Sequence, residues 1–200
     1  MRLLLIIGFW ALASAPSHAQ KTRIIKSVKG GVYSTEAGKV VVFNNYEGRG
    51  LNFSLTFARD TEVQASSRQG VYTVNGQFFQ VLAVPIAPFK TDSAITTLAR
   101  YANNEANYLI RSLPKPVVPF IRVGTDKQGL LCSIWSFPMP EGSNQQIARQ
   151  LFVNFLDGEF IISLGSVQLQ GQDLEQPLNL LLATAHAYAS SPNPITPNRP

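Results

Sequence analysis

An Asn-Gly pair, Asn75-Gly76, lies between two segments rich in β-branched and aromatic residues, and it limits how this chain can fold. Residues 71–74 precede the pair and residues 77–82 follow it. Asn and Gly tolerate the positive φ angles of a two-residue type I′ turn, whose twist matches that of the flanking strands. The sequence therefore predicts a β-hairpin here, and with it an antiparallel sheet.

Two further hairpins are predicted later in the chain. Residues 117–123 and 130–137 flank a loop that contains Asp126 and Gly129, and residues 150–156 and 159–169 flank Asp157-Gly158. Earlier, residues 39–43 are a strand candidate rich in β-branched Val. Apolar and polar residues then alternate from Leu51 to Phe57, and Ala58 follows on the polar side. Period-two alternation with one polar face is typical of a half-buried antiparallel strand.

Two helices are predicted between and after these strands. Apolar residues recur at helical spacing over residues 93–112, after Thr91 or Asp92 as a capping residue and before Pro114. Asp173 is predicted to cap a final helix, with Gln176 placed for a reciprocal capping pair. The apolar stripe expected on this final helix is Leu174, Leu178, Leu181, Leu182, Ala185 and Ala189.

The order of strands, helix, strands, helix predicts an α+β fold. Its expected form is an antiparallel sheet built from hairpins with two main helices packed on one or both faces, an α/β sandwich. Residues 20–190 are predicted to form this single domain. Residues 191–200 contain four Pro and are expected to form a flexible tail.

The first 19 residues are typical of a secretory signal peptide. Arg2 supplies the positive charge, residues 3–13 are almost entirely apolar, and the small residues before and at Ala19 suit cleavage there. This apolar run is shorter than the roughly 20 residues that span a bilayer. The sequence predicts a secreted or periplasmic protein without a transmembrane segment.

The pattern of elements resembles the PsbP-like group of secreted α/β sandwich proteins. The resemblance lies in the strand at residues 77–82, the helix that follows Asp92, and the helix over residues 173–190. It implies a mostly non-catalytic role, that of an accessory protein that docks on a larger assembly. It assigns no functional residue to this chain.

The inventory of reactive residues is small. The chain has 1 Cys and 2 His, one of them His18 in the predicted signal peptide. A disulfide framework and a multi-Cys zinc site are therefore excluded. His186 falls within a helical pattern and Cys132 within an apolar strand, and both are interpreted as structural residues. Asp157 and Glu159 are interpreted as turn residues, although two close carboxylates also occur in glycosidases.

No signature of a cofactor or metal site appears in the sequence, so none is predicted. Calcium loops and phosphate-binding glycine motifs are absent from the 200 residues. The formal net charge is +5, but the basic residues are scattered, which argues against nucleic-acid binding. Residues 20–29 are basic and are interpreted as a solvated terminus or an edge strand, with membrane or cell-wall contact as the alternative.

The candidate binding residues lie in the loop over residues 44–49. Asn45, Tyr46 and Arg49 combine an amide, an aromatic ring and a cation, a mixture enriched in protein interfaces. The leading hypothesis is an exported cell-envelope accessory protein that binds an unidentified envelope protein. The alternatives are a small periplasmic hydrolase with a minimal Asp/Glu/Tyr site and a carrier of an apolar ligand.

Overall fold

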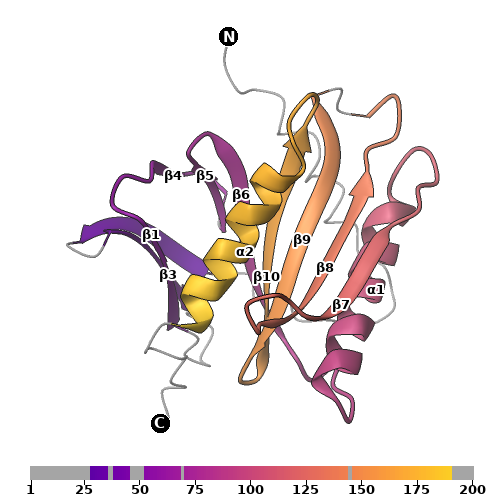
Figure 1. Cartoon of the computed structure of the whole chain (residues 1–200), viewed down its shortest axis with the longest axis horizontal. Helices are drawn as coiled ribbons and strands as arrows, with labels where there is room; N and C mark the ends of the chain where they lie inside the picture. The colour runs from indigo at the N-terminus through magenta and orange to yellow at the C-terminus, as the bar shows by residue number, and fades with distance from the viewer. Residues whose placement is uncertain (1–27, 36–37, 46–51, 69, 144–145, 191–200) are drawn as a thin grey trace.

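The computed structural model describes residues 28–35, 38–45, 52–68, 70–143 and 146–190. These residues form two antiparallel sheets and two helices (Figure 1). The small sheet contains β1 (Val28–Thr35), β2 (Gly38–Asn45) and β3 (Asn52–Phe57). The large sheet contains β4 (Val63–Ala65), β5 (Val71–Val74), β6 (Gln77–Pro85), β7 (Phe120–Thr125), β8 (Leu131–Pro138), β9 (Ile147–Asp157) and β10 (Phe160–Leu169). The helices are α1 (Ala94–Arg111) and α2 (Glu175–Ala189).

The large sheet joins two antiparallel meanders in the order β4-β5-β6-β10-β9-β8-β7. β4 to β6 form the first meander and β7 to β10 form the second. They meet where β10 pairs antiparallel with β6, for example Gly165 with Gln80. The predicted α+β fold, an antiparallel sheet with two packed helices, is confirmed. β1 to β3 form a second sheet that does not pair with the large sheet, and the sequence did not predict this division.

The Asn-Gly turn that the sequence predicts is present. Asn75 has φ 47° and Gly76 has φ 76°, as a type I′ turn requires. Val74 and Gln77 are the last pair of the β5–β6 ladder. The turn therefore fixes the register of this hairpin.

Replacing Gly76 with Val is expected to lower the free energy of unfolding by about 1–2 kcal/mol, because a β-branched residue is strained at positive φ. A Cβ added at Gly76 meets no atom within 4 Å, so the effect comes from the backbone alone. Gly76→Asn is the control, since Asn accepts this conformation at a much smaller cost. Urea unfolding of both variants measures the difference. Equal stability of the two variants would show that φ at this position does not matter.

The two helices cover opposite faces of the large sheet. α1 contacts β7, β8 and β9, whereas α2 contacts β9, β10 and β3 of the small sheet. In Figure 1, α2 crosses in front of the large sheet and α1 lies behind its β7 end. Neighbouring residues of one strand therefore face different helices: Trp135 packs with the α1 residues Ala102 and Ala106, and Ile134 packs against the cluster that contains Leu181 of α2.

α1 follows the predicted periodicity with a corrected cap. Its buried residues are Thr97, Leu98, Tyr101, Ala102 and Ala106, on one face of the helix. Ser93, rather than Thr91 or Asp92, is the N-cap, and its Oγ accepts the Thr96 N–H at 3.1 Å. Thr91 instead donates its backbone N–H to the Thr97 hydroxyl.

α2 begins one residue later than predicted, and its buried face is rotated from the predicted stripe. Asp173 Oδ1 accepts the Glu175 N–H at 3.0 Å, although the N-cap position belongs to Leu174. The Gln176 amide oxygen accepts from Gln172, and this contact replaces the expected capping pair. Leu174 is 39% exposed and Ala189 is exposed. The buried residues are Pro177, Leu181, Thr184, Ala185 and Tyr188.

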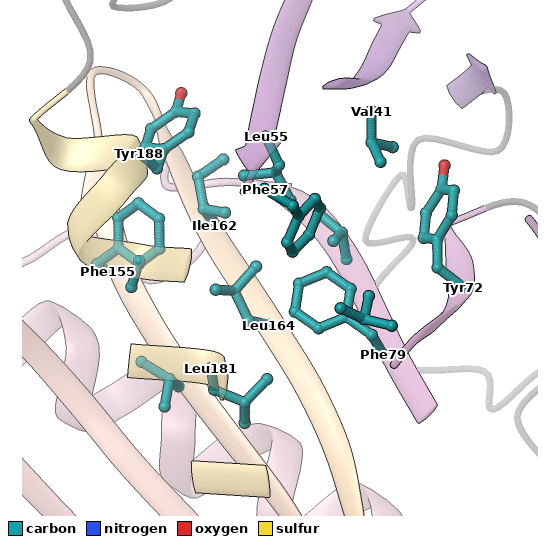
Figure 2. Packing of buried hydrophobic residues seen from close by; sticks show 14 of the residues in the cluster. Val41, Leu55, Phe57, Tyr72, Phe79, Phe155, Ile162, Leu164, Leu181 and Tyr188 are labelled. Atoms are coloured by element: carbon teal, nitrogen blue, oxygen red, sulfur yellow. The ribbon is translucent and has the colours of Figure 1, made fainter. Parts of the chain in front are cut away.

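The main apolar core lies where α2, the small sheet and the large sheet meet (Figure 2). Leu55 and Phe57 of β3 point toward Phe79, and the rings of Phe57 and Phe79 meet edge-on at 5.7 Å. Leu181 of α2 packs into the same cluster. This explains the second half of the alternation seen in the sequence, because Leu55 and Phe57 pack in the core against the large sheet.

Some sequence predictions fall outside this structure. The predicted signal peptide (residues 1–19) and tail (residues 191–200) lie outside the described residues. Within the described part of the chain, neither helix has the length and apolarity that crossing a bilayer demands.

Candidate functional site

The predicted binding loop is only partly described. Asn45 is the last residue of β2 and pairs with Val28 of β1. Tyr46 and Arg49 lie outside the described residues. Their proposed role in binding therefore stays a prediction.

His186 of α2 contacts Asp126 in the turn between β7 and β8, and the two form an ion pair when the imidazole is protonated. Its Nε2 lies 2.7 Å from Oδ2 of Asp126, and both side chains are mostly buried. The other oxygen of Asp126 accepts the backbone N–H groups of Gln128 at 2.9 Å and Leu130 at 3.0 Å. Burial alone raises the pKa of Asp126, but these hydrogen bonds and His186 outweigh it and lower the pKa.

A histidine paired with a carboxylate is two-thirds of a catalytic triad, so the third member matters. In the described part of the chain, no serine, threonine or cysteine side chain is hydrogen bonded to the His186 imidazole. Cys132 lies near enough to Asp126 to feel its charge, but it is 2% exposed. Burial, with Asp126, raises the pKa of the Cys132 thiol to about 11, so it is not a thiolate nucleophile at neutral pH. The contact between His186 and Asp126 therefore links α2 to the turn between β7 and β8.

Acidification is expected to weaken this attachment. The folded-state pKa of Asp126 lies below its ordinary value, so its carboxylate adds stability above the unfolded-state pKa of about 4. That stability is lost as the pH falls through the lower folded-state pKa. Between pH 7 and pH 2–3, roughly, the melting temperature should fall less for Asp126→Asn than for the wild type.

The control for this pH series is Asp60→Asn, which changes an exposed carboxylate in the turn after β3. Its melting temperature should follow the wild-type curve. Parallel curves for the wild type and Asp126→Asn would show that the ion pair contributes no pH-dependent stability.

A second contact fastens the end of α2. The Tyr188 hydroxyl donates a hydrogen bond to Asp157 Oδ2, at the turn between β9 and β10. Burial, together with this hydrogen bond and the charge of Asp157, raises the pKa of Tyr188. Asp157 is thus engaged by α2, and Glu159 is exposed. The arrangement agrees with turn residues rather than with a pair of catalytic carboxylates.

A row of buried polar residues crosses the sheet beneath α1. Ser163 of β10 pairs with Asn154 of β9, which pairs with Ser133 of β8. Asn154 donates from Nδ2 to Ser133 Oγ at 2.9 Å, and the Tyr101 hydroxyl is hydrogen bonded to Ser163. Asn154 and Ser133 are both 0% exposed. Beneath α1 these groups are inaccessible to a substrate in this conformation.

Two titratable side chains near this row, Glu105 and Tyr101, have raised pKa values. Burial raises the pKa of Glu105, and the pKa of Tyr101 is raised by burial and by the Glu105 carboxylate, against a smaller effect of Ser163. Among the described residues, Asn154 Oδ1 and Trp135 Nε1 are the buried polar side-chain atoms that have no hydrogen-bond partner. The row therefore combines satisfied and unsatisfied groups inside the fold.

Two exposed apolar residues, Val118 and Phe120, identify a different candidate site, at the β7 edge of the large sheet. Among the strands that the structure describes, β7 pairs with β8 alone. Val118, just before β7, is 85% exposed, and Phe120 is 56% exposed. Arg122 is exposed on the same side of β7 as Phe120, because side chains two residues apart share a face. We call Val118, Phe120, Arg122 and Arg149 the β7 surface.

Arg149 joins this surface from β9. Its guanidinium donates to Ser136 Oγ at 3.1 Å, and Ser136 is the residue of β8 that pairs with Phe120. Within residues that the structure describes, the ion pairs are Lys115 with Glu141 and His186 with Asp126. Among the described residues, neither arginine of the β7 surface has a carboxylate partner. Aromatic and arginine side chains are the residue types enriched at interaction hot spots.

The opposite edge of the large sheet is less available. β4 has 3 residues and contacts β1 of the small sheet. β7 has 6 residues and its register with β8 runs without a shift from Phe120 to Thr125. Sequence reasoning missed the β7 surface, because an alternating strand looks the same at the edge of a sheet as in its centre.

No protein-family model, curated protein sequence or solved structure matches this chain. The resemblance to the PsbP-like group therefore stays a prediction. In the described ranges, no cluster of three or more His, Cys, Asp or Glu side chains is suited to hold a metal ion.

Proposed function

We propose that this protein is an exported accessory protein that acts by binding a partner protein through the β7 surface. The observation that carries the proposal is the combination of exposed Phe120 with two arginines that lack carboxylate partners in the described structure. Burying such residues against a partner removes apolar area from water and satisfies the guanidinium groups. The signal-peptide pattern of residues 1–19 supports export.

The arrangement of the polar residues supports binding over catalysis. His186 and Tyr188 of α2 are hydrogen bonded to the carboxylates of two turns of the large sheet. The polar row that contains Asn154 is buried beneath α1. A catalytic group has to reach the reacting atoms of its substrate. In the described part of the chain, Val118, Phe120 and Arg122 of the β7 surface are exposed to solvent without rearrangement.

A capture experiment with matched variants tests this proposal. Cell-envelope extract is passed over the immobilised wild type, Phe120→Asp and Leu174→Asp, and the retained proteins are identified by mass spectrometry. Leu174 is a control because it is 39% exposed and lies at the start of α2 rather than on the β7 surface. We expect at least one protein to be retained by the wild type and Leu174→Asp but not by Phe120→Asp.

Two outcomes contradict the proposal. If all three proteins retain the same set, or retain nothing specific, the β7 surface does not bind a partner. Export is tested separately by fractionating cells that produce the chain with a C-terminal tag. Tagged protein of full length in the cytoplasm alone would contradict the exported location.

A further inference from the structure

We propose that the partner contributes an extended, acidic segment that adds to the large sheet as a strand beside β7. This inference rests on the proposed function, because it specifies how the β7 surface binds. It concerns the backbone of β7 as well as its side chains.

The backbone of β7 has the form of a template for another strand. An edge strand presents the outward N–H and C=O groups of alternate residues to solvent, and these groups are satisfied when a further strand pairs with them. The ladder between β7 and β8 is continuous from Phe120 to Thr125. It carries no bulge of the kind that distorts β10 and β9 at Gln168 and Leu169. A regular edge of 6 residues is long enough for a short strand to pair with.

The side chains of β7 differ between its two faces. Ile121 and Val123 are partly buried in the clusters beneath α1, so this face of β7 is already covered. Phe120 and Arg122 are exposed on the other face. A strand added beside β7 therefore places its own residues directly opposite Phe120 and Arg122, at Cβ separations of roughly 5 Å.

This pairing specifies the sequence of the added strand. One residue faces Phe120 and the residue two positions away faces Arg122. An apolar residue opposite Phe120 buries its ring, and Asp or Glu opposite Arg122 forms a cross-strand ion pair. Arg149 adds positive charge over β8, one strand further into the sheet. The partner segment is thus expected to alternate apolar and acidic residues along one face.

The same charges disfavour a second copy of this chain as the occupant. Two β7 strands pairing with each other would bring the arginines of both β7 surfaces together, in a chain of formal net charge +5. Like charges opposite each other destabilise a strand pair. An acidic segment from another protein meets no such repulsion.

Synthetic peptides of about eight residues, a usual strand length, test the inference. The probe alternates Val and Asp on one face and Thr on the other, and a matched peptide carries Lys in place of Asp. Binding is followed by NMR on the ¹⁵N-labelled protein. We expect the Asp peptide to shift the amide signals of β7, and the Lys peptide to bind at least about tenfold more weakly.

Charge reversal and backbone methylation supply the controls. Arg122→Glu is expected to exchange the preference, so that the Lys peptide binds better than the Asp peptide. N-methylation along the peptide edge that faces β7 should abolish binding, whereas methylation along the outer edge should not, because only the facing N–H groups pair with the sheet. Equal effects of the two methylations, or an Asp peptide that causes no shift at β7, would overturn strand addition.

These outcomes are separable from those of the capture experiment. If Phe120→Asp loses a partner but peptides do not add to β7, the proposed function stands and strand addition is wrong. If the Asp peptide induces a dimer in sedimentation analysis without pairing at β7, the inference is also wrong. If Phe120→Asp retains every partner, the proposed function itself fails.

Discussion

Replacing Trp135 with Ala is expected to lower the free energy of unfolding by about 3–5 kcal/mol, the range for removing a buried aromatic side chain. Trp135 is 1% exposed. Its ring stacks on Phe152 with centroids 4.0 Å apart and lies 6.2 Å from the ring of Phe137. Ala102 and Ala106 of α1 pack on the same cluster. The substitution therefore removes a large part of the apolar surface against which α1 packs.

Trp135→Phe separates the ring stack from the indole N–H. Phe keeps an aromatic ring over Phe152 and removes Nε1, which has no hydrogen-bond partner among the described residues. A buried donor without a partner costs about 1–3 kcal/mol, so its removal offsets part of the lost packing. Urea unfolding should show a clearly smaller loss for Trp135→Phe than for Trp135→Ala. Equal losses would mean that the ring stack does not carry the stability of this cluster.

Asn154→Asp is expected to destabilise the protein by about 3–5 kcal/mol at pH 8, the cost of a buried charge without a partner. Asn154 is 0% exposed and sits between Ser133 and Ser163 on neighbouring strands. Burial raises the folded-state pKa of the new carboxyl above its unfolded value. The variant should therefore regain stability as the pH falls from 8 to about 5, because the carboxyl then becomes neutral.

The comparison that isolates this effect is Asn107→Asp, which places the same carboxyl at an exposed position of α1. Its stability relative to the wild type should change little over this pH range. Chemical denaturation at several pH values measures all three proteins. If Asn154→Asp and Asn107→Asp behave alike, the polar row beneath α1 is open to water.

Local elements could be predicted from the sequence because their signals are local. The Asn75-Gly76 turn, the three hairpins and both helices follow from turn residues and from periodicity within short windows. The buried stripe of α2 was only partly correct, because Leu174 lies at the helix end, beyond the surface that α2 covers. Periodicity defines a face of a helix, but the neighbours of that helix decide which part of the face is buried.

The contacts that bear on function depend on residues far apart in the chain. His186 was interpreted as structural, but its partner Asp126 lies 60 residues away and looks like an ordinary turn residue. Which strand forms the edge of the sheet depends on how the two meanders join, and no signal within β7 encodes that. The division into a small and a large sheet likewise depends on which distant segments pair, and no local sequence pattern predicts it. The predicted binding residues Tyr46 and Arg49 are not tested, since they lie outside the described residues.

The pairing of β6 with β10 also has a consequence for the order of folding. In the large sheet, every other pair of neighbouring strands joins successive strands, so only this junction brings together distant parts of the chain. Contacts between distant segments carry the larger loop-closure entropy and slow folding. We expect the two meanders to form first and to dock later. β7, β8 and α1 come from one continuous stretch, residues 94–138, so the free edge can take shape before the sheet is closed.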